Sequence, residues 1–221
     1  MHAPRLLFAA CLALVTLAPA TFSPASAAPP RPATLTDQDR SDIGRIEGYL
    51  NTLKTATASF LQVADNGGIA RGKFFLSRPG KMRFEYEPPT PILMVSTGGG
   101  SLVYYDSLLK QTSYLPVDST PLGLLLRDNL KFGGEVTITK VERGPGTIRL
   151  SLVQTKDPDQ GTLILTFSER PMALKQWTVI DAQQRSTTVT LMELQSDVKL
   201  DPKLFQFTSV GGAGVPPGQA N

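Results

Sequence analysis

The hydrophobic pattern of the chain changes period twice, and each change marks a different kind of segment. Leu6–Leu17 is an apolar run that follows the basic start Met1–Arg5, and Ala25-Ser26-Ala27 after it fits a small-x-small cleavage pattern. This arrangement is typical of a secretory signal peptide. Phe8–Cys11 loosely resembles a lipobox, but the apolar run continues past Cys11, so we favour cleavage after Ala27 over lipidation.

A period near 3.6 follows and predicts an amphipathic helix. Thr36 is a candidate N-cap, with acidic residues in the first turn. Ile43, Ile46, Leu50 and Leu53 then recur at spacings of three and four. We therefore expect a helix of about five turns with one apolar face.

From Thr55 onward the period is two. In Lys81–Glu87 the residues Met82, Phe84 and Tyr86 alternate with charged ones, which is typical of a strand with one buried face. The same alternation occurs at Ile148/Leu150/Leu152, Leu163/Leu165/Phe167, Trp177/Val179 and Thr187/Val189/Leu191. Turn-forming residues separate the runs at Asp65–Gly68, Arg78–Lys81, Gly98–Gly100, Gly144–Gly146 and Asp157–Gly161. The spacing predicts a mainly β (α+β) fold with one large, curled antiparallel sheet of about 10 or 11 strands, and such a sheet can close into a barrel.

One segment breaks this pattern. Ser119–Asn129 has an N-cap candidate, an early proline and a leucine-rich run, which predicts a short apolar helix. Over an open end of the barrel it would act as a lid. The alternation does not distinguish a barrel filled by side chains from one that encloses an apolar cavity. We also expect a helical turn at Pro202–Leu204.

These patterns divide the chain into four parts: a signal peptide (1–27), a flexible leader (28–35), one domain (36–210) and a flexible tail (211–221). Beyond the signal no apolar stretch approaches the roughly 20 residues of a membrane span. We expect the cleaved protein to be a soluble monomer in the periplasm.

Composition narrows the chemistry. The only histidine and the only cysteine, His2 and Cys11, lie in the signal peptide. Without them the domain has no imidazole base, thiolate, disulfide or zinc site, and we expect no metal and no cofactor. The formal charge of +3 loses one unit with Arg5, and no basic stripe indicates a nucleic-acid partner. The fold must be stabilised by its apolar core alone.

Four short motifs suggest chemistry, and each is better interpreted as structure. Ser107–Lys110 matches S-x-x-K, but it lies between two strand-like runs and lacks the partner motifs of serine–lysine enzymes. Glu85 and Glu87 share the solvated face of a strand. Asp157–Gly161 lacks the spacing of a calcium loop. Gly98–Ser101 lacks the lysine of a phosphate loop, so we expect a turn there and no enzymatic activity.

Arg78 is the one charged residue with a suggestive position. By the period of two it shares a face with Phe74 and Leu76. If that face is inward, a cation stands at the rim of an apolar interior. The alternative is an arginine at a turn corner that extends its head to water.

Several segments resemble the outer-membrane lipoprotein carrier protein (LolA) family, in order along nearly the whole chain after the signal. They are Ala58–Gln62, Gly72–Pro79, Met82–Phe84, Val103–Asp106 as the family's aromatic strand, Thr120–Arg127 as its lid helix, Asp181–Thr187 as its late hairpin and Phe205–Phe207 as its closing strand. Each motif is short, and their order and spacing carry the resemblance. Met82 stands where the family usually has an aromatic residue, and Phe84 where tryptophan is common.

The resemblance implies an incomplete, curled antiparallel β-barrel with a helical lid over a hydrophobic cavity. It also implies a carrier of acylated lipoproteins between the two membranes. Its partners would be an inner-membrane lipoprotein-releasing ABC transporter complex and an outer-membrane lipoprotein receptor. Arg78 would hold the lid through hydrogen bonds. The candidate cavity residues are Phe60, Phe74, Leu76, Met82, Phe84, Tyr86, Leu122, Leu125 and Leu126. Two alternatives stay open: a periplasmic binder of other lipids or hydrophobic small molecules, and a lipoprotein-sensing regulatory domain.

Overall fold

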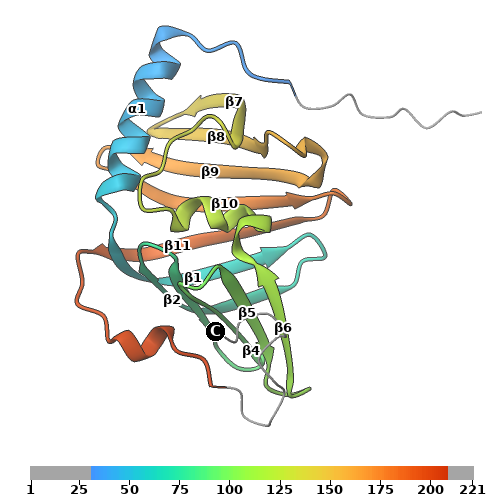
Figure 1. Cartoon of the computed structure of the whole chain (residues 1–221). Helices are drawn as coiled ribbons and strands as arrows, with labels where there is room; N and C mark the ends of the chain where they lie inside the picture. Colours follow the sequence, from blue (N-terminus) through green and yellow to red (C-terminus); the bar gives the residue numbers. More distant parts are fainter. Residues whose placement is uncertain (1–30, 209–221) are drawn as a thin grey trace, which may run out of the picture.

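A curled antiparallel sheet with one α-helix and short 3-10 turns makes up the computed structural model, which describes residues 31–208 (Figure 1). The predicted signal peptide, the leader up to residue 30 and the predicted tail lie outside the described residues.

Every strand runs antiparallel to its neighbours. The strands are β1 (Thr55–Ala64), β2 (Ile69–Ser77), β3 (Lys81–Tyr86), β4 (Ile92–Thr97), β5 (Ser101–Asp106), β6 (Gln111–Pro116), β7 (Val136–Gly144), β8 (Thr147–Gln154), β9 (Gly161–Glu169), β10 (Met172–Asp181) and β11 (Ser186–Ser196). Their order is β6-β5-β4-β3-β2-β1-β11-β10-β9-β8-β7, so β6 and β7 are the two edges and do not pair with each other. The prediction of an incomplete antiparallel barrel is confirmed.

The period-two runs bury their apolar positions on the inner face of this sheet. Ile148, Leu150 and Leu152 of β8 are buried, and so are Leu163, Leu165 and Phe167 of β9. Phe60 of β1 is fully buried because Gly72 on the paired strand β2 leaves room for it. A Cβ at Gly72 would lie 2.7 Å from the Phe60 ring and 2.0 Å from the Glu85 carbonyl oxygen. The ring therefore depends on a glycine opposite it.

The predicted helix is α1 (Asp37–Thr52), and it begins where the pattern indicated. Thr36 and Asp39 form a capping box, in which the Asp39 amide donates to Thr36 Oγ1 (3.2 Å) and the Thr36 amide donates to Asp39 Oδ2 (2.8 Å). Ile43, Ile46 and Leu50 are buried against the inner face of the sheet. Figure 1 shows α1 crossing the ends of β7 to β10.

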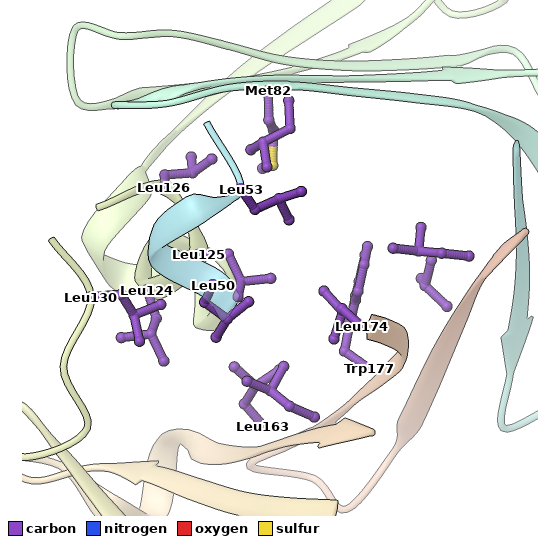
Figure 2. Close-up of a cluster of buried hydrophobic side chains, with 14 of the residues drawn as sticks. Leu50, Leu53, Met82, Leu124, Leu125, Leu126, Leu130, Leu163, Leu174 and Trp177 are labelled. Atoms are coloured by element: carbon purple, nitrogen blue, oxygen red, sulfur yellow. The ribbon is translucent and has the colours of Figure 1, made fainter. Parts of the chain in front are cut away.

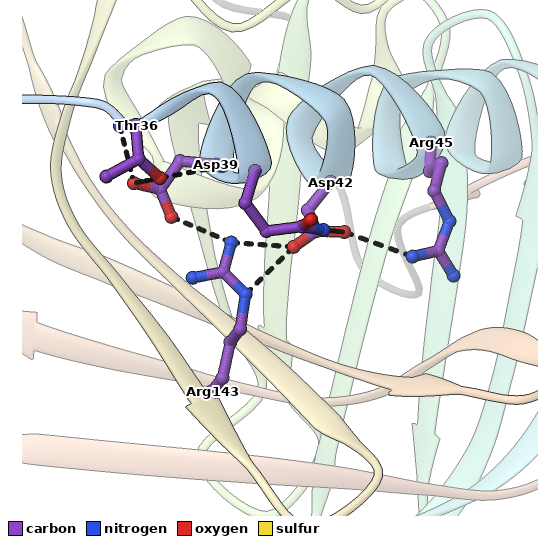
Figure 3. A network of polar contacts seen from close by, with 6 residues as sticks. Thr36, Asp39, Asp42, Arg45 and Arg143 are labelled. Carbon is purple, nitrogen blue, oxygen red and sulfur yellow. Dashed lines mark hydrogen bonds and ion pairs between the residues drawn. The ribbon is translucent and has the colours of Figure 1, made fainter.

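An ionic network fixes the first half of α1 to the edge strand β7 (Figure 3). Arg143 of β7 places Nη2 2.8 Å from Asp39 Oδ1 and 2.7 Å from Asp42 Oδ2. Its Nε donates to Asp42 Oδ2 at 2.9 Å, and Arg45 Nη1 lies 3.0 Å from Asp42 Oδ1. The Asp42 side chain is only 2% exposed, so its charge depends on these partners.

The carboxyl groups of Asp39 and Asp42 both stay ionised to a lower pH than an ordinary aspartate does. Hydrogen bonds from Thr36, with a further one from Arg143, lower the pKa of Asp39 to about 2. Burial opposes ionisation of Asp42, but hydrogen bonds from Arg143 and Gln38 outweigh it and lower the pKa of Asp42. The stability that these carboxylates add is therefore present above their ordinary pKa of about 3.9 and lost as pH falls through the lowered values.

Replacing Arg143 with methionine should destabilise the fold at neutral pH. The substitution leaves Asp42 buried without its main partner, and we expect a loss of about 2 to 3 kcal/mol, since Arg143 is partly exposed. Urea denaturation should show the difference from wild type at pH 7. The difference should shrink between about pH 4 and pH 2, where the wild-type carboxylates become protonated.

Asp37→Asn is the matched control. Asp37 pairs with Arg40 on the exposed side of the same helix turn, at 3.6 Å and with both side chains in water. Such pairs contribute little, so unfolding should stay within about 0.5 kcal/mol of wild type. A variant Arg143→Met that is as stable as Asp37→Asn at pH 7 would contradict the role of the network.

The end of the described chain packs on the outer face of the sheet. The predicted turn is η4 (Pro202–Phe205), which contacts β3 and β4, and Arg83 Nη1 donates to the Leu204 carbonyl at 3.0 Å. Phe205 is buried, and Phe207 packs against Tyr105 at 5.6 Å. The closing strand expected at Phe205–Phe207 is wrong. Phe205 ends η4, the amide of the exposed Gln206 donates to the Lys203 carbonyl at 3.1 Å, and Phe207 packs on Tyr105.

Candidate functional site

The segment after β6 covers the interior of the barrel. It consists of two 3-10 turns, η1 (Val117–Ser119) and η2 (Pro121–Leu126), and we call Val117–Leu126 the lid. The helix predicted over 119–129 is thus shorter and tighter than expected, and no side-chain hydrogen bond caps it. Thr120 before η2 and Arg127 after it both have extended backbone. At this end the Leu126 carbonyl accepts from the Gly80 amide and the Arg127 carbonyl from the Arg78 guanidinium, both in the turn between β2 and β3.

The lid presents leucines to the apolar interior. Leu124, Leu125 and Leu126 are buried, and Leu122 is half-buried. Figure 2 shows Leu125 beside Leu50 of α1, with Leu174 and Trp177 of β10 on the other side of the space. A cavity of about 20 Å³ remains among these side chains. Its lining consists of Leu50, Leu53, Phe74, Leu76, Arg78, Met82, Phe84, Leu122, Leu125, Leu126, Leu174, Trp177, Leu191 and Leu194.

The small volume shows that the lid is closed in this structure. A space of this size holds about one water molecule, far less than an acyl chain. The barrel is thus almost filled, and the lid leucines are part of the filling. A larger ligand can enter only if the lid moves and its leucines leave the interior.

Eight of the ten residues singled out from the sequence line this cavity. They are Phe74, Leu76, Arg78, Met82, Phe84, Leu122, Leu125 and Leu126. The other two lie behind them in the same core: Phe60 packs edge-on against Phe84 at 5.3 Å and against Tyr86 at 5.0 Å. Burial raises the pKa of the Tyr86 hydroxyl to about 12, and that hydroxyl donates to Gln62 Oε1 at 2.7 Å.

Six lining residues were missed as cavity residues: Leu50, Leu53, Leu174, Trp177, Leu191 and Leu194. The helical spacing marked Leu50 and Leu53 as apolar, and the alternation marked Trp177 and Leu191. These patterns identify core positions in general. They do not show which core positions lie beneath the lid.

Arg78 joins the end of α1 to the end of the lid. It is 8% exposed, and its guanidinium donates to three main-chain carbonyls. Nε donates to Arg127 O at 2.7 Å, and Nη2 bonds the same oxygen. Nη1 donates to Leu50 O and, at 3.4 Å, to Leu53 O. These carbonyls lie at the end of α1 and directly after η2, and Leu50 O accepts in addition a long bond of 3.3 Å from the Leu53 amide. A cation suits carbonyls at the end of a helix.

The charge of Arg78 is balanced mainly by these carbonyl dipoles. Burial lowers its pKa, and the nearby carboxylate of Asp128 opposes that shift. Guanidinium groups nevertheless stay protonated at neutral pH. The buried cation therefore depends on the carbonyls of both elements, and breaking the contact exposes an unsatisfied charge or unsatisfied carbonyls.

Further hydrogen bonds hold the chain that follows the lid. They are Gly80 N to Leu126 O (2.8 Å), Lys54 Nζ to Asp128 Oδ1 (3.0 Å), Asn51 Nδ2 to Leu130 O (2.9 Å), Leu130 N to Asn51 Oδ1 (2.8 Å) and Phe132 N to Glu47 Oε1 (2.6 Å). Three of these five bonds are made by Asn51 and Glu47 of α1, which is itself held to β7. We therefore expect the lid to open by movement of η1 and η2, while residues 128–132 remain hydrogen-bonded where they are.

Gly123→Ala should push the lid open. A Cβ at Gly123 would lie 2.4 Å from the Val117 carbonyl oxygen and 3.3 Å from Asp118 Cα. These contacts are too close, so η1 and η2 would have to move apart. We expect a loss of about 1 to 3 kcal/mol in the free energy of unfolding, as for overpacking, and stronger binding of an apolar fluorescent probe. Denaturation and probe titration measure the two effects.

Gly99→Ala is the control for this substitution. A Cβ at Gly99, in the turn between β4 and β5, would have its nearest neighbour at 3.9 Å, which is ordinary contact. This variant should resemble wild type in stability and in probe binding. If Gly123→Ala bound no more probe than Gly99→Ala, the lid would not control access to the interior.

Two of the short motifs that suggested chemistry form turns in the structure. Ser107 and Lys110 occupy the exposed turn between β5 and β6, and Ser107 Oγ donates to Pro91 O at 3.0 Å. Asp157–Gly161 is a 3-10 turn, η3 (Pro158–Gln160), leading into β9. Within residues 31–208, no group of three or more His, Cys, Asp or Glu is placed to hold a metal ion. No helix in the same range is long and apolar enough to cross a membrane.

Comparison of the chain with models of known protein families shows which family it belongs to. The model of the family described as outer membrane lipoprotein carrier protein LolA matches residues 51–208, which include all eleven strands and the lid. The chain belongs to the LolA family. The resemblance drawn from the short motifs is confirmed, and this family is one of carrier proteins.

Sequence relatives agree with that assignment to LolA. An outer-membrane lipoprotein carrier protein of Methylococcus capsulatus is 31% identical over 180 residues, which cover 77% of this chain and 85% of the relative. One of the same description from Pseudomonas aeruginosa is 30% identical over 189 residues, covering 81% and 86%.

Solved structures give weaker likenesses to this LolA chain. A LolA superfamily protein of Nitrosomonas europaea has a TM-score of 0.43 at 10% identity, covering 75% of this chain and 97% of that one. The Pseudomonas aeruginosa MucA/MucB complex contains a chain with a TM-score of 0.41 at 14% identity, covering 81% and 68%. At TM-scores below 0.5 these likenesses carry no argument about function.

Proposed function

We propose that the protein is a periplasmic carrier that takes up the acyl chains of lipoproteins in the interior beneath the lid. The observation that carries this proposal is an interior that is apolar except for Arg78, closed by Leu122, Leu125 and Leu126 of the lid and held shut by that buried arginine. The names of its relatives, outer-membrane lipoprotein carrier proteins, support the choice of cargo.

The energetics suit a carrier. An acyl chain in water costs about 0.8 kcal/mol per CH₂, so three chains cannot cross an aqueous gap unshielded. The hydrogen bonds that close the lid are each worth about 1 kcal/mol net. Closure is therefore strong enough to keep the empty interior sealed and weak enough for entering acyl chains to overcome.

The same balance explains release. When the lid closes, its leucines refill the space that the acyl chains occupied, and Arg78 regains its carbonyls. Binding is then opposed by the protein's own leucines, so cargo is held only moderately. No bond forms or breaks in this cycle, and neither a catalytic residue nor a cofactor is needed.

The direction of transport requires partners on both sides. We propose that an inner-membrane lipoprotein-releasing ABC transporter complex opens the lid during loading, and that an outer-membrane receptor receives the cargo. Loading from inner-membrane vesicles and transfer to outer-membrane vesicles, each followed with a labelled lipoprotein, test the two steps. A protein that neither loads nor transfers would contradict the proposal.

A binder of other lipids or hydrophobic molecules is the second candidate, because the same cavity would serve it. Native mass spectrometry of the protein isolated from the periplasm distinguishes the two. A bound lipoprotein supports the carrier, and free lipid alone supports the second candidate.

A further inference from the structure

A second, larger space lies on the other side of the lid from the cavity. It is an open groove of about 590 Å³ between the lid and the ends of β8 and β9. Its lining consists of Asp118, Thr120, Leu124, Arg127, Glu135, Val136, Leu152, Val153, Gln154, Lys156, Gln160, Gly161 and Leu163. The volume falls in the range of ordinary ligand sites.

The lid is the partition between the groove and the cavity. Leu122, Leu125 and Leu126 line the cavity, whereas Thr120 and Leu124 line the groove. Because one short helix contributes to both spaces, a displacement of η2 joins them. A molecule that enters the interior with one part can leave its other part in the groove.

The groove surface is about half polar and half apolar, whereas the cavity surface is almost wholly apolar. Its leucines are largely covered, Leu124 at 5% and Leu152 at 1% exposed, and a ligand meets charged and amide side chains beside the remaining apolar surface. Within residues 31–208, the carboxylate of Asp118 and the ammonium of Lys156 have neither a hydrogen bond nor an ion pair. Gln154 Nε2 makes only a long bond of 3.4 Å, to Asp118 O.

This chemistry selects the kind of ligand. An acyl chain in the groove would remove water from a carboxylate, an ammonium and amide groups without replacing their hydrogen bonds, which is unfavourable. An extended peptide offers amide donors and carbonyl acceptors at every residue. It can pair with both signs of charge and with the Gln154 and Gln160 amides.

We propose that this groove holds the peptide arm that follows the acylated residue of the cargo while the acyl chains occupy the interior. The inference rests on the proposed carrier function and adds a second contact to it. It also gives the groove a role in distinguishing lipoproteins from free lipids, which lack the peptide.

Two synthetic ligands test the inference on the purified protein. One is tripalmitoyl-cysteinyl-serine, and the other carries six further uncharged Ser, Gly and Asn residues. In wild type the extension should lower Kd about tenfold, the gain expected from a few hydrogen bonds. Gln154→Trp, which fills the groove, should abolish that gain and leave the Kd of the short ligand unchanged.

Matched variants keep the test interpretable. Thr155→Trp changes the next, exposed residue, whose hydroxyl contacts Thr137 outside the groove, and it should retain the gain. Gln160→Trp fills the groove from the η3 loop and should repeat the effect of Gln154→Trp even if a bulky residue on β8 disturbs folding.

The outcomes separate the two proposals. If the extension gives no gain in wild type, or if the gain survives both groove-filling variants, the inference is wrong while acyl binding stands. If neither ligand binds wild type, the carrier function itself fails and the inference fails with it.

Discussion

Arg78→Leu should accumulate as loaded carrier and transfer its cargo at least about tenfold more slowly than wild type. The leucine removes the side-chain donor of the Leu53 and Arg127 carbonyls, and it leaves the Leu50 carbonyl with only a long bond of 3.3 Å from the Leu53 amide. Each unsatisfied group costs about 1 to 3 kcal/mol, so the closed state loses its advantage over the open one. The measurement is the fraction of protein isolated with bound lipoprotein, together with the rate of transfer to outer-membrane vesicles.

Two further substitutions sharpen this test. Arg78→Lys keeps the charge but lacks the fork that reaches both elements, so its transfer rate should lie between wild type and Arg78→Leu. Arg71→Leu makes the same change at an exposed position of β2 and should behave as wild type. Wild-type transfer by Arg78→Leu would show that the arginine does not control closure.

Trp177→Ala should lower stability strongly and increase binding of a fluorescent fatty acid. The Trp177 side chain is 2% exposed, lines the cavity and packs against Phe74 at 5.9 Å and Phe84 at 6.1 Å. Its truncation should cost about 3 to 5 kcal/mol and lower Tm by roughly 10 °C. The enlarged apolar space should improve fatty-acid affinity about fivefold, since a chain then displaces fewer side chains.

Phe167→Ala is the control because Phe167 is fully buried but does not line the cavity. It packs against Tyr49 of α1, with ring centroids 6.3 Å apart. Its loss of stability should be similar, without any gain in fatty-acid binding. Equal binding by Phe167→Ala and Trp177→Ala would mean that general loosening of the core, and not the space beneath the lid, accounts for the affinity.

The elements that the sequence predicted well are those set by local periodicity. The capping box at Thr36 and the apolar spacing from Ile43 to Leu50 identified α1, because both signals lie within the helix itself. Alternation identified β3, β8 and β9, because a strand with one buried face shows it directly. The large curled sheet then followed from the number of strands and their turns, whereas its incomplete closure was predicted from the family resemblance.

The lid and its closure depend on contacts that periodicity does not encode. Arg78 bonds carbonyls 28 and 49 residues away, and a main-chain carbonyl leaves no mark in the sequence. The 3-10 form of η2 is set by those same contacts and by Gly123 against Val117. Trp177 was recognisable as core, but its position beneath the lid is a property of the tertiary structure.

Hydrogen exchange of the Gly80 amide tests the central claim most directly. In the closed state this amide donates to Leu126 O at 2.8 Å, so its protection reports that the end of the lid is in place. Adding a triacylated lipopeptide should make Gly80 exchange faster, while the amides shared by β8 and β9 keep their protection. Saturating binding of the lipopeptide with Gly80 still fully protected would show that acyl chains do not enter beneath the lid.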